Sequence, residues 1–282
     1  MEGFESSNVK EAAATEAEAA PAMVSVTDLS SYMYCPRLLY QQKVLGYEEK
    51  LNPAMVLGAI RHNFYDLANK HEEKIVVHLP TEFSTEKING AYSETYQNLL
   101  RATVMNRSNS LEMFGLEPAG VISELRPIAI AEAAERAGNV HRFAALHNIF
   151  GEELWQQLIP KILTEMKVKS PLLRLKGVVD KVEIYNNTVL PIELKTGKMP
   201  NDGVWPQHRV QVSAYMMLLQ EKFNTSVNKA IIRYLDHNIS KTVALNPYME
   251  LEVKELTENV IRLLESGVIP KQCGRERCGC GR

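Results

Sequence analysis

The stretch from Leu172 to Lys198 constrains the fold most strongly, because it predicts a hairpin that carries acidic residues inside apolar strands. The dipeptide Asn186-Asn187 separates the two runs, and asparagine tolerates the positive φ that a two-residue hairpin loop requires. With that loop, Asp180 lies directly across from Glu193, at a Cβ separation of about 4.5–5.5 Å. Like charges placed so are destabilising by themselves. A divalent cation bound between the two carboxylates would compensate for this cost.

Lys195 adds an ammonium to the same face, because it follows Glu193 by two residues and side chains alternate along a strand. Two sources of metal-binding oxygen beside one positive charge suit the hydrolysis of a phosphodiester. The alternative interpretation is a solvated charged face, the usual role of three such residues on a hairpin. However, the hairpin is otherwise largely apolar, and strands apolar on both faces are generally covered on both. Carboxylates within such strands need partners.

The pattern formed by Asp180 and Glu193-Leu194-Lys195 resembles the D…ExK core of the PD-(D/E)xK nuclease superfamily. Val179 replaces the nominal proline, a departure common in the RecB-like branch, and segments 177–180 and 193–197 resemble that branch closely. The resemblance implies an α/β fold of the restriction-endonuclease type, with a mixed central sheet flanked by helices. It also implies a hydrolase that cleaves DNA with Mg²⁺ or Mn²⁺, with Lys195 orienting the attacking water.

A helix is predicted to begin at Asn52-Pro53, since asparagine caps helices and proline suits the first helical position. Gly58 and His62 lie one turn apart on this helix. Alone, His62 is more often a partly buried histidine than a ligand. Its spacing from Gly58 resembles the RecB-like motif whose histidine joins the acids at the metal. The ligand set implied by the resemblance is His62, Asp180, Glu193 and the backbone carbonyl of Leu194.

A second predicted helix follows the hairpin and carries Gln211 and Tyr215, four residues apart on one face. By itself, Gln211 suits a surface position and Tyr215 a core position. Their spacing resembles the Q-xxx-Y motif of RecB-like nucleases. The resemblance implies that Gln211 and Tyr215 support the active site and position the DNA.

Four cysteines occur in the chain: Cys35 near the start, and Cys273, Cys278 and Cys280 within the last ten residues. Four thiols suit a tetrahedral zinc site or a [4Fe–4S] cluster, and disulfides are the third option. Their spacing does not choose between iron and zinc. A cysteine followed by proline, with three more at the far end, resembles the iron–sulfur RecB-like nucleases. The nearest of these is the CRISPR-associated exonuclease family, fourth in the Cas nomenclature, and it implies a [4Fe–4S] cluster, with zinc as the lesser alternative.

Composition places few further limits on the protein. Hydrophobic residues make up 45% and charged residues 23% of the chain, as in ordinary globular proteins. The net charge of −2 excludes a globally basic nucleic-acid-binding surface, so any DNA groove must be a local patch. No apolar run approaches a membrane span, and the start does not resemble a secretory signal. We therefore expect a cytoplasmic protein without membrane contacts.

The domain organisation expected from the sequence has few parts. Residues 1–22 are rich in Ala, Glu and Ser, which predicts a disordered tail, and residues 23–282 are expected to form one RecB-like nuclease domain. Within that domain, 85–167 is expected to be a helical insertion, and 268–282 a cysteine-rich tail that completes the cluster. Helical spacing of apolar residues supports the insertion up to its end, at Leu154, Leu158, Ile162 and Met166.

The resemblance implies a DNA exonuclease, with 5′-to-3′ polarity on single-stranded DNA or at DNA ends. Its expected role is to trim spacer precursors in CRISPR adaptation, a part of antiviral defence, with the CRISPR integrase subunits as partners. Two alternatives stay open. One is a stand-alone DNA-repair or replication nuclease of the RecB-like type, and the other is a catalytically idle DNA-binding subunit of an integrase complex.

Overall fold

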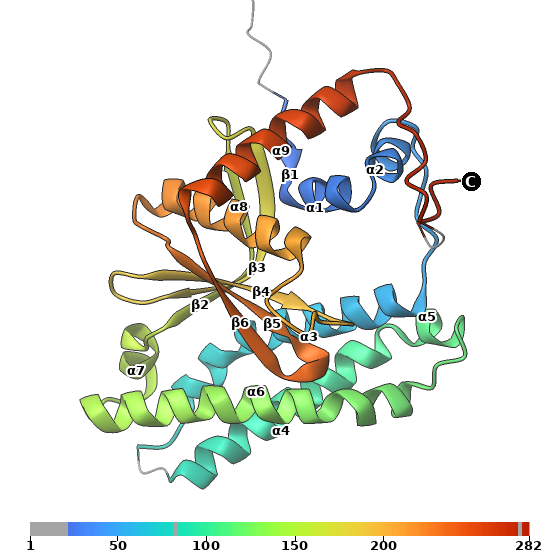
Figure 1. The fold of residues 1–282 in the computed structure, drawn as a ribbon. Coiled ribbons are helices and arrows are strands. Elements are labelled where there is room, and N and C mark those ends of the chain that lie inside the picture. The colour runs from blue at the N-terminus through green and yellow to red at the C-terminus, as the bar shows by residue number, and fades with distance from the viewer. Residues whose placement is uncertain (1–21, 82–83, 276–277, 282) are drawn as a thin grey trace, which may run out of the picture.

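A mixed sheet runs through the centre of the computed structural model, which describes residues 22–81, 84–275 and 278–281, with helices on both faces (Figure 1). Within these ranges the sheet has six strands in the order β1-β3-β4-β5-β6, with β2 paired to β3. The β1–β3 and β4–β5 pairs are parallel and the others antiparallel. The expected α/β fold is confirmed. Its strands are β1 (Val24–Ser25), β2 (Lys161–Ser170), β3 (Leu175–Ile184), β4 (Val189–Lys195), β5 (Lys229–Tyr234) and β6 (Ile239–Ala244).

One face of the sheet packs against helices from both ends of the described chain. Val179 and Val182 of β3 are fully buried in a core that also contains Met216 and Leu219. Cys35 separates the first two helices and caps the second of them. The helices on this side of the molecule are α1 (Val26–Tyr34), α2 (Pro36–Lys43), α8 (Pro206–Phe223) and α9 (Pro247–Glu265).

The opposite face of β4 is covered by a helical lobe with its own core. Leu190, Ile192 and Leu194 of β4 are buried in that core together with Phe64 and Tyr96. None of the helices in the described ranges has both the length and the apolar character needed to cross a membrane. The lobe consists of α3 (Pro53–Val77), α4 (Thr85–Met105), α5 (Ser108–Glu112), α6 (Pro118–His147) and α7 (Gly151–Gln157).

The predicted hairpin register is confirmed. Strands β3 and β4 are antiparallel, and the Tyr185 N–H donates to the Thr188 carbonyl across a two-residue loop. The ladder ends at the pair Lys181–Ile192, one position before the two acids. It ends there because the carboxylate of Asp180, rather than a backbone carbonyl, accepts the Leu194 N–H, at 2.8 Å.

The expected helix through Ile162 and Met166 is wrong, because residues Lys161–Ser170 form β2. Helix α7 ends at Gln157, and Pro160 then blocks any continuation, since proline has no N–H and its ring clashes with the preceding turn. The following segment bonds along the whole of β3 instead. The helical segment therefore ends before residue 161 rather than at 167. The predicted tail lies outside the described residues, except for residue 22.

Buried charges join the helical lobe to the sheet. Glu132 of α6 binds Lys181 of β3 at 3.3 Å and Arg233 of β5 at 2.7 Å. The side chains of Glu132 and Lys181 are 1% and 3% exposed. A second buried pair, Arg136 and Glu72, connects α6 to α3 at 2.7 Å. Because each charge is compensated only by its partners, these contacts fix where α6 sits on the sheet.

We expect Glu132→Leu to lower the free energy of unfolding by about 3–5 kcal/mol, because it leaves Lys181 buried without its main partner. Urea denaturation measures this loss. The double variant Glu132→Leu/Lys181→Met also removes the buried ammonium and should recover part of the loss, while Arg233 keeps Glu135 as a partner, at 3.2 Å. A single variant that loses less than about 1 kcal/mol would show that the pair does not hold the lobe in place.

Candidate active site

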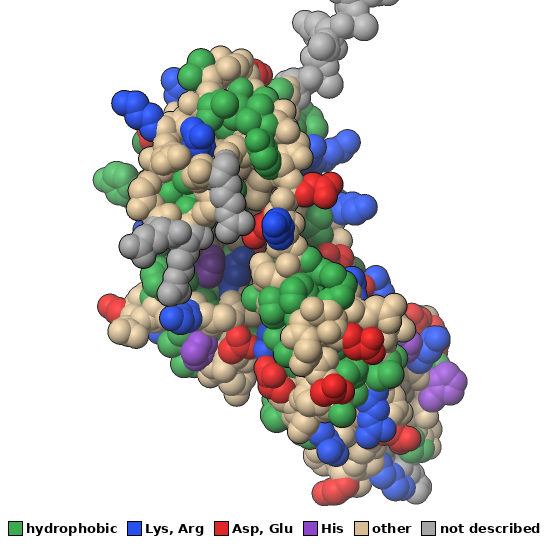
Figure 2. Space-filling model, turned by 90° about the vertical axis from the view of Figure 1, so that its right-hand side faces the viewer, with side chains coloured by type: hydrophobic (Ala, Val, Ile, Leu, Met, Phe, Trp, Pro, Cys, Tyr) green, Lys and Arg blue, Asp and Glu red, His purple; other side chains and the backbone are tan. Residues whose placement is uncertain are grey.

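The candidate active site lies where β3 and β4 meet the start of α3 and the first turns of α8. The face shown in Figure 2 is hollowed between the upper and lower parts of the molecule, and basic and histidine side chains lie in the hollow. Strand β4 presents Glu193 and Lys195 near its end, and α3 presents His62. The structure thus brings residues more than a hundred positions apart into one place, as the sequence predicts.

Asp180 is the centre of a group of three possible metal ligands. The Nδ1 atom of His62 lies 3.4 Å from Asp180 Oδ1, and the contact with Asp180 raises the pKa of His62. A carboxylate oxygen of Glu165 completes the group, and the three ligand atoms lie within 4.8 Å of one another. One imidazole and two carboxylates are a donor set that Mn²⁺ and Mg²⁺ accept.

Glu165 is the member of this group that the sequence analysis missed. The β2–β3 register places it across from Asp180, because Thr164 pairs with Lys181 on one side and Met166 with Val179 on the other. Glu165 has a φ of +49°, a conformation that is costly for a residue with a side chain. The available signal in the sequence was the alternation of charged and apolar residues from Glu165 to Lys169, but the helical interpretation of this segment concealed it.

Glu193 lies outside this group and is held from the side of α8. Its Oε1 accepts hydrogen bonds from Lys195 Nζ at 2.8 Å and from Gln211 Nε2 at 2.7 Å. Gln211 Oε1 accepts a second bond from Lys195 Nζ, at 2.7 Å. The amide of Gln211 therefore orients the carboxylate and the ammonium at once, which is possible because an amide both donates and accepts.

The second oxygen of Glu193, Oε2, is buried without a hydrogen-bond partner. Burial first, and then the charge of Asp180, raise the pKa of Glu193 to about 8. A buried acceptor of this kind is costly unless something binds it. A divalent cation beside Asp180 would supply a partner and favour the ionised carboxylate. The residues present therefore fit a Mg²⁺ or Mn²⁺ ion.

Gln211 and Tyr215 lie behind the catalytic face rather than on it. They are 4% and 2% exposed, and Gln211 Nε2 also lies 3.3 Å from the Tyr215 hydroxyl. Gly177 of β3 lets the Tyr215 ring approach, since a Cβ at that position would lie 2.7 Å from the ring. This geometry favours a role in positioning Glu193 and Lys195. Direct contact of Gln211 and Tyr215 with DNA, part of the expectation from sequence, stays a prediction.

The loop after Lys195 is anchored to α3. Asp236 accepts the Gly197 N–H at 2.6 Å and binds Arg61 of α3 at 2.9 Å. His237 contacts the Gly197 carbonyl at 3.1 Å. These contacts fix the end of β4. They were not expected from the sequence, because Asp236 and His237 come from the turn between β5 and β6.

His208 is a further neighbour of the site that sequence reasoning missed. It lies in the first turn of α8, and its Nδ1 is 3.2 Å from the Tyr234 hydroxyl. Burial, followed by the nearby charge of Lys195, lowers the pKa of His208 to about 4. A neutral imidazole adds no second cation beside Lys195. The predicted role of the Leu194 carbonyl stays a prediction, although the Leu194 N–H holds Asp180 against β4.

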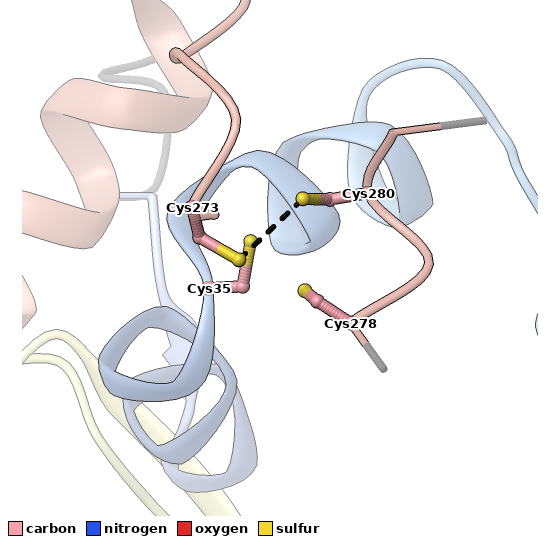
Figure 3. Close-up of side chains that lie close together, drawn as sticks. All are labelled: Cys35, Cys273, Cys278 and Cys280. Atoms are coloured by element: carbon pink, nitrogen blue, oxygen red, sulfur yellow. Dashed lines mark hydrogen bonds between the residues drawn. The ribbon is translucent and has the colours of Figure 1, made fainter. Parts of the chain in front are cut away.

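The four cysteines form a separate cluster at the junction of α1 and α2. Their sulfur atoms point toward one another and lie within 4.8 Å, with Cys273 and Cys280 at 3.5 Å (Figure 3). All four are free thiols. Arg37 reinforces the arrangement, because it donates to the carbonyls of Cys280 and Pro270, both at 2.8 Å.

The chemistry of this donor set fits a metal or a cluster. Hydrogen bonding to the Arg275 backbone lowers the pKa of Cys273 to about 7, whereas burial raises the pKa of Cys278 to about 12. Four thiolates so close together would repel one another unless a cation bound them. Zinc and a [4Fe–4S] cluster both accept four cysteines.

Comparison with known families gives a match over nearly the whole chain. The family model described as PD-(D/E)XK nuclease superfamily matches residues 23–281. This range contains the hairpin acids, His62, Gln211 and the four cysteines.

Comparison with individual proteins gives weaker matches. The chain is 29% identical over 126 residues to a protein of Myxococcus xanthus (strain DK1622) named CRISPR-associated exonuclease Cas4/endonuclease Cas1 fusion. The match covers 43% of this chain and 20% of that protein, so it spans about a fifth of the relative's length. A crystal structure of SSO0001 matches at 19% identity over 51% of this chain and 69% of that one, with a TM-score of 0.28. A TM-score this low supports no inference.

We expect Glu193→Gln to stabilise the protein at alkaline pH when no divalent cation is added. The folded-state pKa of about 8 exceeds the ordinary value near 4.3, so wild-type stability falls as pH rises through that window. Glutamine does not ionise and avoids the loss. The melting temperature of the variant should exceed that of wild type by at least about 2 °C at pH 8.5, where 1 kcal/mol corresponds to about 2–4 °C.

The same comparison at pH 3.5 should show almost no difference, because Glu193 is then largely protonated in both the folded and the unfolded wild type. The exposed variant Glu255→Gln is the matched control and should change nothing at either pH. An equal shift at both pH values would exclude ionisation of Glu193 as the cause.

We expect Cys35→Ser to remove the bound metal and to release the C-terminal segment from α2, because four thiolates are needed to complete either kind of site. Metal analysis of anaerobically purified protein measures the first effect, and thermal unfolding the second. The melting temperature should fall by several degrees. A variant with undiminished metal content would show that Cys35 is not a ligand.

Proposed function

Because the chain belongs to the PD-(D/E)XK nuclease superfamily, we propose that this nuclease is a metal-dependent exonuclease of single-stranded DNA and DNA ends. The observation that carries the proposal is that two groups of polar side chains adjoin at the hairpin. One set comprises His62, Glu165 and Asp180, and the other is the bonded group of Glu193, Lys195 and Gln211. Opposed acids beside a held ammonium suit phosphodiester hydrolysis and have no structural purpose of their own.

In this proposal His62, Asp180 and Glu165 hold the divalent cation, with Glu193 and the Leu194 carbonyl completing its ligands. When bound, Mg²⁺ or Mn²⁺ lowers the pKa of a water molecule and offsets negative charge on the phosphate. Asp180 is oriented for this role by the Leu194 N–H, and His62 by Asp180. Such fixed ligands need no rearrangement when the cation arrives.

Lys195 is the proposed catalytic cation of the protein itself. Its ammonium is held by Glu193 and Gln211 and is one-fifth exposed, so it can reach a phosphate bound beside Glu193. There it orients the attacking water and stabilises charge that develops on the phosphate oxygens. Gln211 acts as a positioning residue because it bonds both Glu193 and Lys195, and Tyr215 supports it by contact with the Gln211 amide; both are buried.

The cysteine cluster has a separate, structural role in this proposal. A [4Fe–4S] cluster held by Cys35, Cys273, Cys278 and Cys280 joins the C-terminal segment to α2, and zinc would serve the same purpose. The free thiols suit a reducing, cytoplasmic setting.

The biological assignment is CRISPR adaptation, with trimming of spacer precursors in the 5′-to-3′ direction and integrase subunits as partners. It is supported by the matched relative, whose name joins a CRISPR-associated exonuclease to the endonuclease Cas1. A stand-alone repair nuclease would have the same site and would differ in its genomic neighbours. An idle DNA-binding subunit is less favoured, since it would have no use for a buried carboxylate with an unpartnered oxygen.

We expect Lys195→Ala to slow DNA cleavage at least about 100-fold, because it removes a charge aimed at the reacting phosphate. The measurement uses end-labelled single-stranded DNA, Mn²⁺ and anaerobically purified protein, and the product ladder also reports polarity. Lys254→Ala, an exposed lysine on α9, is the matched control and should cleave like wild type.

Undiminished cleavage by Lys195→Ala would remove the proposed mechanism. A folded, metal-loaded wild type that binds DNA but never cleaves it would instead favour the idle DNA-binding subunit.

A further inference from the structure

A groove of about 820 Å³ runs along β2 and β3 beside α8. Four lysines line it: Lys167 and Lys169 of β2, Lys176 of β3 and Lys222 of α8. Glu221 is the one acidic residue among its described lining residues. The groove therefore has a local positive charge that the net charge of −2 for the whole chain conceals.

The side-chain ammonium groups of the groove lysines have no ion-pair or hydrogen-bond partner within the described part of the chain. Lys169 and Lys176 lie directly across from each other in the β2–β3 ladder. Like charges so opposed destabilise a strand pair. An arrangement that costs stability and lacks an internal partner is explained when an external anion binds it.

These lysines also continue the line of the active site. In the β2–β3 register, Glu165 lies across from Asp180, Lys167 pairs with Val178, and Lys169 pairs with Lys176. The intervening residues of both strands, among them Val168 and Val179, pack into the core beside α8.

Alternation along the strands therefore puts Lys167, Lys169 and Lys176 on one face, and Glu165 and Asp180 follow further along the same two strands. Asp180 and Lys176 are four residues apart, which is about 13 Å along a strand. The acids and these three strand lysines thus follow one another along β2 and β3, with the acidic group at one end.

We propose that the lysine groove, defined by Lys167, Lys169, Lys176 and Lys222, binds the sugar–phosphate backbone of the DNA strand that is being cut. This inference rests on the proposed nuclease function and adds the path of the substrate to it. Successive phosphates of a single strand contact successive lysines, while the phosphate at the end of the row reaches Asp180. Flexible lysines suit a backbone of any sequence, because an ammonium recognises a phosphate as a point charge.

The test compares a triple variant of the groove with a triple variant elsewhere that has the same change in charge. The groove variant is Lys167→Gln/Lys169→Gln/Lys176→Gln. The control is Lys87→Gln/Lys229→Gln/Lys254→Gln, three exposed lysines of α4, β5 and α9. Fluorescence anisotropy measures binding of a labelled single-stranded 20-mer without divalent cations, over a range of salt concentrations. Thermal unfolding establishes that both variants are folded.

We expect the groove variant to bind at least about 10-fold more weakly at low salt, and the control to bind like wild type. The slope of log K against log salt should decrease in magnitude by about 2, since each single-strand phosphate contact contributes about 0.7. Cleavage of the same 20-mer with Mn²⁺ should show the loss mainly as a higher KM.

Equal weakening in both triple variants would overturn the proposal, because total charge rather than the groove would then govern binding. Unchanged binding by the groove variant of an active nuclease would overturn the groove as the DNA path and leave the nuclease function standing. A wild type that neither binds nor cleaves DNA would overturn both, and the groove would then be tested as a site for an acidic protein surface.

Discussion

The buried carboxylate of Glu193 is the constraint on which the rest of the site depends. A charge without water must be compensated by its neighbours, and here each neighbour comes from a different element. Lys195 follows it on the same strand and Gln211 comes from α8, whereas Asp180 of the adjoining strand adds a like charge that raises the pKa of Glu193. The sheet, the helix and the hairpin register therefore have to be correct together, and an error in any of them would leave an ion buried alone.

The same principle organises the interface between the sheet and the helical lobe. Glu132 of α6 is matched by Lys181 and Arg233 from two strands, so the lobe has one preferred position on the sheet. A similar ion pair between Arg61 of the lobe and Asp236 lies near the end of β4. Because α3 brings His62 to Asp180, the lobe is a scaffold for the site as well as a cover for the core.

The hairpin could be predicted from the sequence because its information is local: a loop that favours one register, and alternation that follows from it. Glu165 could not, since its position depends on β2 bonding to β3 across a segment whose apolar spacing also suits a helix. The four cysteines were identifiable from their number, but only the fold shows that their sulfur atoms converge. The lysine groove was concealed for a related reason: composition averages over the whole surface, whereas its charge is confined to two strands and one helix.

The cysteine cluster has a consequence for how the protein is made. Arg37 and Cys280, which adjoin across the cluster, are 243 positions apart in the chain. During synthesis Cys35 leaves the ribosome long before its three partners Cys273, Cys278 and Cys280. The hairpin, by contrast, can close as soon as it emerges, since its contacts are close in sequence. The four sulfur atoms can therefore converge only after the C-terminal cysteines have been made, and a chain that stops short of residue 273 would hold one of the four thiols alone.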